Sequence, residues 1–172
     1  MRLIRTDDFE TVKTKYIEVI EQTPGIRQYA RWEYGRHPTD ASLRSYIDNG
    51  EMYCLMDQDR IAGMVAVVMH QGEDYRPVSW AEPLADHQVA TLHLLAVCPG
   101  YRGRGLGRVI LDEAIDLAER NGKRALRLDT LLSNLPAQHM YETAGFSYRG
   151  TQYLYAENTA WTDFLYYEKT LE

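Results

Sequence analysis

The stretch CPGYRGRGLGRVIL, residues 98–111, combines four glycines with three arginines and then continues into apolar residues at helical spacing. The apolar run QVATLHLLAV, residues 88–97, comes directly before it. Pro99 and Gly100 end that run, and the helical pattern extends over residues 105–121. The stretch therefore predicts a buried strand, a glycine-rich turn and the start of a helix, in that order.

The turn has the composition of an anion site. The first N–H groups of a helix have no partner within the helix and carry partial positive charge, so they bind phosphate groups. Gly103, Gly105 and Gly107 lack a Cβ, which lets successive N–H groups turn toward one anion. The three arginines add charge-assisted hydrogen bonds. We expect this turn to bind a diphosphate.

Two nucleotide-binding motifs fit the turn poorly. A Walker A loop needs Lys followed by Ser or Thr after its last glycine, and Arg108-Val109 stands there instead. A dinucleotide-binding fingerprint needs a third glycine where this chain has Arg108, although Asp129 lies at a suggestive distance near the end of the next strand. The first 90 residues also lack repeated βαβ units. Both motifs are therefore disfavoured.

Length and charge restrict the class of protein. The chain has 172 residues, of which 45% are hydrophobic, which predicts a single domain over residues 1–172. Its formal net charge is −6 and its pI is about 5.4. An acidic chain is a poor binder of nucleic acid and of anionic membranes, so we expect neither partner. An RNA-binding role for the RGRG segment is disfavoured on the same ground.

Neither a leader nor a metal site is apparent. The N-terminus has no apolar core of the secretory kind, and no apolar run is long enough to span a membrane. The two cysteines, Cys54 and Cys98, have no CxxC spacing and no histidine partners in a metal pattern. We expect a cytoplasmic protein with reduced thiols and no bound metal.

The periodicity along the chain predicts a mixed α/β sheet with helices packed on it. Helices are expected at residues 7–22, 39–49, 105–121 and 135–143. Strands are expected at residues 2–5, 51–57, 61–70, 88–97, 124–130, 146–155 and 164–171. Residues 71–86 are polar and contain two prolines, which predicts a long surface loop.

Two segments carry a family resemblance. LLAVCPGYRGRGLGRVIL, residues 94–111, resembles the acetyl-CoA-binding signature of the GNAT superfamily of N-acetyltransferases, through Arg102, Gly105 and Gly107. NLPAQHMYETAGF, residues 134–146, is similar to the second motif of that family. The resemblance covers roughly residues 88–150. It implies the GNAT fold: a central mixed, mostly antiparallel, splayed β-sheet flanked by helices.

The resemblance also assigns the donor site. It implies that acetyl-CoA is the cosubstrate and that the backbone of Leu95 and Val97 pairs with its pantetheine arm as an added strand. Asn134 would contact the pantetheine or stabilise the loop into the next helix. The pyrophosphate would be held by backbone amides around the glycine-rich turn, at Arg102, Gly103, Arg104, Gly105, Gly107 and Arg108.

Two side chains are candidates for proton transfer. The family places a tyrosine at the position of Tyr141, which would protonate the leaving thiolate, although a tyrosine there can also simply pack. His93 shares a strand face with Leu95 and Val97, and an ordinary imidazole pKa of about 6.5 suits a base near neutral pH. LHLLAV also resembles the strand of the arylalkylamine N-acetyltransferases, in which histidines assist deprotonation. A buried structural histidine is the alternative. By resemblance, a backbone N–H near Val97 would stabilise the oxyanion.

We therefore expect transfer of acetyl from acetyl-CoA to a primary amine by direct attack in a ternary complex. A non-catalytic acyl-CoA-binding module on the same fold is the alternative, and an acetyl-Cys98 intermediate is disfavoured. The acceptor amine can belong to a small molecule or to a peptide. The oligomeric state also stays open, and a homodimer is possible. The aromatic residues of 26–37 would shape the acceptor pocket or join the core, and the acidic residues of 71–86 would be solvated or attract a cationic amine. His139 is expected on a helix surface.

Overall fold

The computed structural model describes residues 1–172 and contains one seven-stranded sheet in the order β1-β2-β3-β4-β5-β7-β6. No helix has the length and apolarity needed to cross a membrane. The strands are β1 (Arg2–Arg5), β2 (Met52–Asp57), β3 (Arg60–Val68), β4 (Val89–Val97), β5 (Ala125–Leu131), β6 (Ser147–Ala156) and β7 (Ala160–Thr170). The helices are α1 (Phe9–Gln22), α2 (Ile26–Tyr29), α3 (Asp40–Asp48), α4 (Leu106–Arg120) and α5 (Leu135–Thr143).

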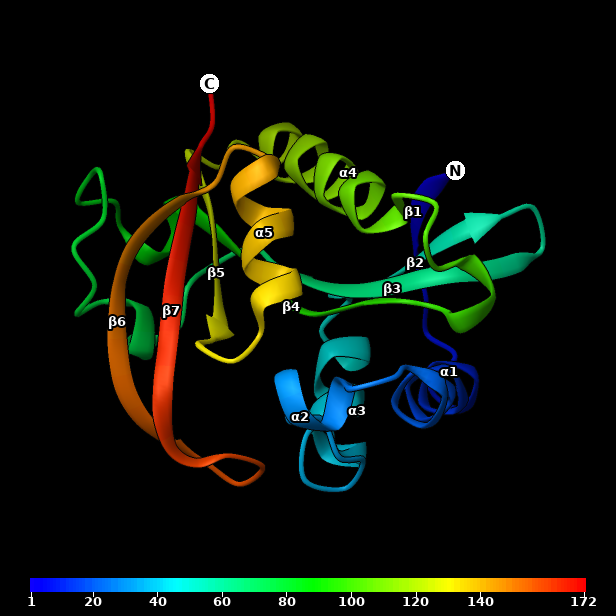
Figure 1. Ribbon diagram of the computed structural model, residues 1–172. Coiled ribbons are helices and arrows are strands. Elements are labelled where there is room, and N and C mark those ends of the chain that lie inside the picture. Colours follow the sequence, from blue (N-terminus) through cyan, green and yellow to red (C-terminus); the bar gives the residue numbers. More distant parts are fainter.

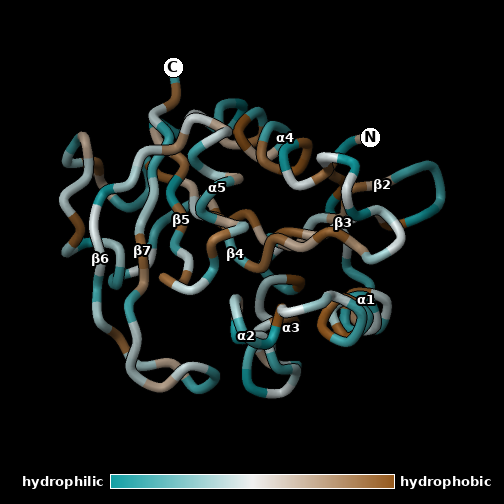
Figure 2. The backbone as a smooth tube through the Cα atoms, viewed as in Figure 1, coloured by the Kyte–Doolittle hydropathy of each residue, from teal (hydrophilic) through white to brown (hydrophobic).

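The helices cover both faces of the strands that come first in the chain. Strands β1 to β4 are antiparallel, with α4 above them and α1, α2 and α3 below them in Figure 1. Apolar residues concentrate along β3, β4 and β5 and on the inner side of α4 (Figure 2). The central strands are covered on both sides, which explains why their apolar runs are nearly continuous.

The sheet opens between β4 and β5. These two strands are parallel, and they pair only from Val89–Leu92 on β4 to Ala125–Leu128 on β5. Beyond that point the two strands separate, while β5 keeps its pairing with β7 as far as Leu131. The expected mixed, mostly antiparallel and splayed sheet is confirmed. The opening leaves the carboxyl-terminal half of β4 without a neighbour on one side.

A bulge in β4 lies at this opening. Leu94 has a left-handed backbone with φ of 55°, and the register with β3 shifts between the pairs Ala66–His93 and Met64–Ala96. The hydroxyl of Tyr16 on α1 donates a 2.6 Å hydrogen bond to the Leu94 carbonyl oxygen. Since a left-handed leucine is costly, the buried Tyr16 contact helps to hold the bulge in place.

The structure differs from the sequence-based expectations in three places. Helix α2 was not expected, and β7 begins at Ala160, four residues before the expected start. The third difference concerns residues 71–86, which are not simply a surface loop. A short 3₁₀ turn, Glu73–Tyr75, lies within this segment, and a second one, Asp86–Gln88, begins at its last residue. The side chains of Tyr75 and Val78 are buried.

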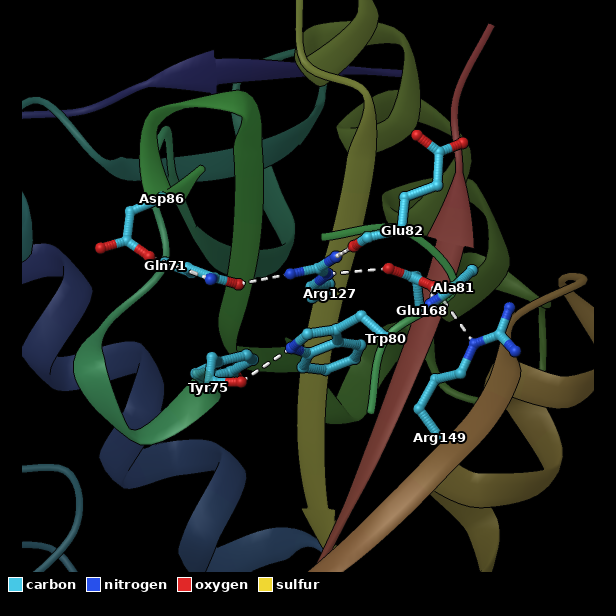
Figure 3. A network of polar contacts seen from close by, with 9 residues as sticks. All are labelled: Gln71, Tyr75, Trp80, Ala81, Glu82, Asp86, Arg127, Arg149 and Glu168. Carbon is cyan, nitrogen blue, oxygen red and sulfur yellow. Dashed lines mark hydrogen bonds and ion pairs between the residues drawn. The ribbon is translucent and has the colours of Figure 1, made fainter. Parts of the chain in front are cut away.

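A buried arginine on β5 explains why this segment packs against the sheet. Arg127 is fully buried and donates hydrogen bonds to Glu168 on β7 at 2.8 Å and to Gln71 at 2.7 Å (Figure 3). Its guanidinium lies 4.2 Å from the centre of the Trp80 ring. Glu168 also accepts a hydrogen bond from the backbone N–H of Ala81. A buried charge needs such partners, and residues 71–86 supply those that β7 does not.

Candidate active site

Two adjoining cavities lie at the opening between β4 and β5. The first, which we call the α4 groove, has a volume of about 330 Å³ and extends from the glycine-rich turn along β4 to α5. The second, the inner cavity, has a volume of about 220 Å³ and lies between β4, β5 and the β6–β7 hairpin. Six residues line both cavities: Ala30, Trp32, Leu95, Asn134, Ala137 and Met140. The two cavities are therefore neighbours along one path.

The glycine-rich turn gives the α4 groove the geometry of an anion site. Gly103 and Gly105 have left-handed backbones, with φ of 74° and 71°, and no atom lies within 4 Å of where a Cβ would be. Gly105 is the N-cap of α4, and no side chain caps that end of the helix. The free N–H groups of the first turn therefore face an open space that an anion can enter.

Gly107 has a different role in the packing. A Cβ at this position would lie 2.5 Å from the Met140 sulfur, so the missing side chain lets α5 approach the first turn of α4. Met140 lines both cavities. The third glycine of the turn thus helps to bring α5 to the site.

The three arginines of the turn are placed differently. Arg102 lines the α4 groove, whereas Arg104 lies over the ring of Tyr101 at 5.2 Å. The Arg108 side chain bonds Asp112 at 2.8 Å, and its backbone N–H donates to the Gly105 carbonyl. Of the six residues expected around the pyrophosphate, those that line the groove are Arg102, Gly103, Gly105 and Gly107. Pyrophosphate binding by these residues stays a prediction, and Arg104 and Arg108 do not line the groove.

The other expected donor-site residues also lie at the cavities. Leu95 and Val97 line the α4 groove on the free side of β4, where an extended arm has room to lie alongside the strand. Asn134 is the N-cap of α5, and its side-chain oxygen accepts a 3.2 Å hydrogen bond from the N–H of Ala137. This hydrogen bond is consistent with the loop-stabilising role expected for Asn134.

Tyr141 lies on α5 and lines the inner cavity, with 8% of its surface exposed. Its ring packs against Phe146 and Tyr167, which fixes its position. Burial raises the pKa of Tyr141 well above its ordinary value, with a smaller contribution from the charge of Asp129. The phenol therefore keeps its proton across the physiological range, as a proton donor must.

His93 lines the same cavity, but its surroundings change its chemistry. Its ring stacks on Tyr46, and burial lowers the pKa of His93 to about 4. The Thr91 hydroxyl donates its proton to the carbonyl of His70, so the 3.2 Å contact with His93 assigns the proton to Nε2. Nδ1 is then the basic nitrogen. The expectation of an ordinary imidazole pKa near 6.5 is wrong, because the strand buries the ring.

We expect a His93→Gln variant to keep every limb of the kcat/KM profile between pH 5 and 8 that the wild type shows. His93 is already neutral throughout that range because burial lowers its pKa to about 4. The unfolded chain binds a proton near pH 6.5, so wild-type stability should fall as the pH drops from there toward 4. The variant should lack this part of the fall, measured by chemical denaturation. A limb near pH 6 to 7 that disappears in the variant would contradict this assignment.

Asp129 is the functional candidate that sequence reasoning missed. It lies on β5 beyond the last pair with β4, lines the inner cavity, and accepts a hydrogen bond from the Tyr75 hydroxyl. Burial raises the pKa of Asp129, and the Tyr75 bond opposes that shift. A carboxylate in the apolar strand ALRLDTL was the available signal, because apolar strands rarely bury a charge without a use for it.

The buried network described above positions Tyr75. Trp80 stacks on Tyr75 with ring centres 6.0 Å apart, and its indole N–H donates to the Tyr75 carbonyl at 2.7 Å (Figure 3). Arg127, under Trp80, and Asp129 lie two positions apart on β5. Residues 71–86 thus contact β5 at two side chains: Arg127, through Gln71 and Trp80, and Asp129, through the Tyr75 hydroxyl.

The remaining candidates are resolved by burial. Cys98 is buried and burial raises the pKa of its thiol, which disfavours a thiolate nucleophile. His139 is exposed on α5, as expected. Trp32 lines both cavities and also packs edge-on against Tyr16, so it belongs to the site and to the core.

An open strand edge, an uncapped helix start and a buried tyrosine lie together at these cavities, an arrangement that suits an acyl-CoA-dependent acyltransferase. Residues 18–146 match the model of the acetyltransferase (GNAT) family, which is three quarters of the chain, and the chain belongs to that family.

Curated relatives match over shorter segments. Streptothricin acetyltransferase from Streptomyces lavendulae is 36% identical over 74 residues, or 43% of this chain and 39% of that enzyme. The ribosomal protein bS18-alanine N-acetyltransferase of Escherichia coli K12 is 43% identical over 58 residues, or 34% of this chain and 39% of that enzyme. The chain thus matches about two fifths of the length of each relative.

Solved structures agree with the fold over almost the whole chain. A GNAT acetyltransferase from Streptococcus agalactiae has a TM-score of 0.75 at 20% identity and covers 99% of this chain and 95% of its own. An acetyltransferase from Salmonella typhimurium, solved with its cofactor acetyl-CoA, has a TM-score of 0.69 at 15% identity, over 100% and 94% of the two chains. At these identities the likeness concerns the fold.

Proposed function

We propose that this protein transfers an acetyl group from acetyl-CoA to a primary amine, by direct attack in a ternary complex. The observation that carries the proposal is the junction of the two cavities. The α4 groove begins at an anion-binding helix start, and it adjoins an inner cavity lined by Tyr141 and Asp129. Donor and acceptor can therefore enter separately and meet at the opening of the sheet.

The residues of the α4 groove fit acetyl-CoA. The uncapped first turn of α4 and the side chain of Arg102 suit a diphosphate, and the free edge of β4 suits an extended amide-containing arm. Acetyl-CoA, when bound, supplies the acetyl group as a thioester. Leu95 lines both cavities, so the backbone around the β4 bulge lies at the place where the acetyl carbonyl would meet the amine.

Two side chains then divide the proton transfers. As the new N–C bond forms and the C–S bond breaks, Tyr141 protonates the leaving sulfur, and the proton that the nitrogen loses on becoming an amide restores the Tyr141 hydroxyl. The attacking ammonium must first lose a proton, and Asp129 is placed to accept it. Its raised pKa makes Asp129 a stronger base than an ordinary carboxylate, whereas the lowered pKa of His93 makes that imidazole a weaker base. His93 stays a candidate for a supporting role in the same cavity.

Acetyl-CoA at about 100 times its Kd should stabilise the folded protein by about 2.7 kcal/mol, measured by thermal or chemical unfolding. A Gly105→Ala variant should lose most of this stabilisation, because a Cβ would disturb the left-handed N-cap and narrow the approach to the first turn of α4. The same samples, mixed with a panel of amines, should release free CoA and yield acetylated product by mass spectrometry.

Gly122→Ala is the matched control for that variant. Gly122 lies beyond the other end of α4, has φ of 67°, and also has open space where a Cβ would be. Each alanine should therefore lower the stability of the ligand-free protein by about 1 to 2 kcal/mol. Equal losses of acetyl-CoA stabilisation in both variants, or no stabilisation of the wild type, would refute the donor site.

A further inference from the structure

The inner cavity contains a carboxylate without a cationic partner. Asp129 is its only acidic lining residue, and neither lysine nor arginine lines it. The one hydrogen bond to the Asp129 side chain comes from the Tyr75 hydroxyl. His37 and His93 line the same wall, and burial lowers the pKa of both imidazoles, although the charge of Asp129 opposes that shift at His37. No lysine or arginine of the cavity wall therefore balances a negative charge on Asp129.

A second carboxylate strengthens the negative potential. Three acidic residues of 71–86 have basic partners: Glu73 and Asp86 pair with Arg76, and Glu82 pairs with Arg124. Asp74 pairs with no basic residue, and its charge acts on both Asp129 and His93. Of the two alternatives for this acidic segment, Asp74 supports attraction of a cation, whereas the others are engaged at the surface.

Most of the remaining wall is apolar, and the cavity is small. Trp32, Tyr46 and Phe164 contribute aromatic surface beside Leu92 and Leu131. A volume of about 220 Å³ is smaller than the 300–1,000 Å³ typical of pockets that take drug-sized ligands. The cavity therefore combines one carboxylate that faces no lysine or arginine with a small, mostly apolar enclosure.

We propose that the acceptor is a small primary amine with an apolar body, which binds as an ammonium and carries no carboxylate next to its amino group. The inference rests on the proposed acetyl transfer and names its substrate class. An ammonium supplies the positive charge that is missing beside the Asp129 carboxylate. The carboxylate of an α-amino acid would lie beside Asp129 in a small, mostly apolar cavity with no lysine or arginine to receive it, and like charges so placed repel strongly.

The test compares matched pairs that differ by the carboxylate alone: phenethylamine with phenylalanine, and 3-methylbutylamine with leucine. Each is incubated with the enzyme and acetyl-CoA, and kcat/KM is measured from CoA release, with the acetylated product identified by mass spectrometry. The amine of each pair should exceed its amino acid by at least about tenfold. A peptide with a free N-terminal alanine is a third arm, and we expect it to react more slowly than the amines.

A charge variant tests the electrostatic cause. Asn158 lines the inner cavity from the β6–β7 hairpin and donates a hydrogen bond to the Arg31 carbonyl. Asn158→Lys should lower kcat/KM for both amines and reduce the preference over the amino acids. Asn158→Met loses the same hydrogen bond and has a side chain of similar length, so it should keep the wild-type preference. The difference between the two variants isolates the charge.

The outcomes separate the substrate class from the transfer itself. Amino acids that react as fast as the matching amines, or equal effects of the two Asn158 variants, overturn the charge argument and leave acetyl transfer standing. A peptide that is acetylated while both amines are not overturns the small-amine class and again leaves the transfer standing. If acetyl-CoA binds and no arm gives product, the proposed function and this inference both fail.

Discussion

A Tyr141→Phe variant should lose about 10²–10³-fold in kcat while its Kd for acetyl-CoA stays close to the wild-type value. The phenylalanine ring fills the same space between Phe146 and Tyr167, so the change removes only the hydroxyl from the inner cavity. Without that proton the sulfur must leave as a thiolate. Single-turnover kinetics measures the chemical step, and calorimetric titration measures the binding of acetyl-CoA.

Tyr167→Phe is the matched control for Tyr141→Phe. Tyr167 packs against Tyr141 at 6.0 Å between ring centres, and its hydroxyl donates to Glu142 without lining the inner cavity. Its loss should therefore leave kcat nearly unchanged. Equal effects of the two substitutions would indicate a packing role for Tyr141, and an unchanged kcat in Tyr141→Phe would exclude it as the proton donor.

An Asp129→Asn variant should lower kcat/KM for an amine by about 10²–10⁴-fold, because it removes the proton acceptor and the charge that faces the ammonium. Its folded state should be at least as stable as the wild type at neutral pH. Burial raises the pKa of Asp129, so the folded protein resists its ionisation, and an amide of the same shape avoids that cost. Steady-state kinetics and thermal unfolding of the same sample separate the two effects.

Tyr75→Phe gives the second measurement for Asp129. The Tyr75 hydroxyl bond lowers the pKa of Asp129, so its removal should move the acidic limb of kcat/KM to higher pH without abolishing activity. Wild-type activity in Asp129→Asn would exclude Asp129 as the base. An acidic limb that does not move in Tyr75→Phe would show that the limb belongs to another group.

Local sequence signals predicted most of the fold and the donor half of the site. The N-cap of Asp8, the glycines that end helices and the alternation within strands act between near neighbours, so α1, α4 and α5 lie close to where they were expected. The glycine-rich turn and Tyr141 belong to such local elements. The turn joins β4 to α4 and Tyr141 lies on α5 after β5, so the order of these elements along the chain places both.

Residues 71–86 show why local signals were insufficient elsewhere. Their polar composition predicted solvent exposure, but the charge of Arg127 on a distant strand requires buried partners, which include Gln71 and the Glu82 carbonyl. The short α2 was missed for a related reason, since four residues give too little periodicity to recognise.

The sequence by itself determined the family of the chain, the helix start that suits a diphosphate and the tyrosine that suits proton donation. The tertiary structure decided the pKa shifts of the two candidate bases and which side chains line the inner cavity. Burial beside Tyr46 lowers the pKa of His93, and burial at the opening of the sheet raises that of Asp129. Both shifts depend on contacts between residues far apart in the chain, because desolvation is a property of the packed molecule.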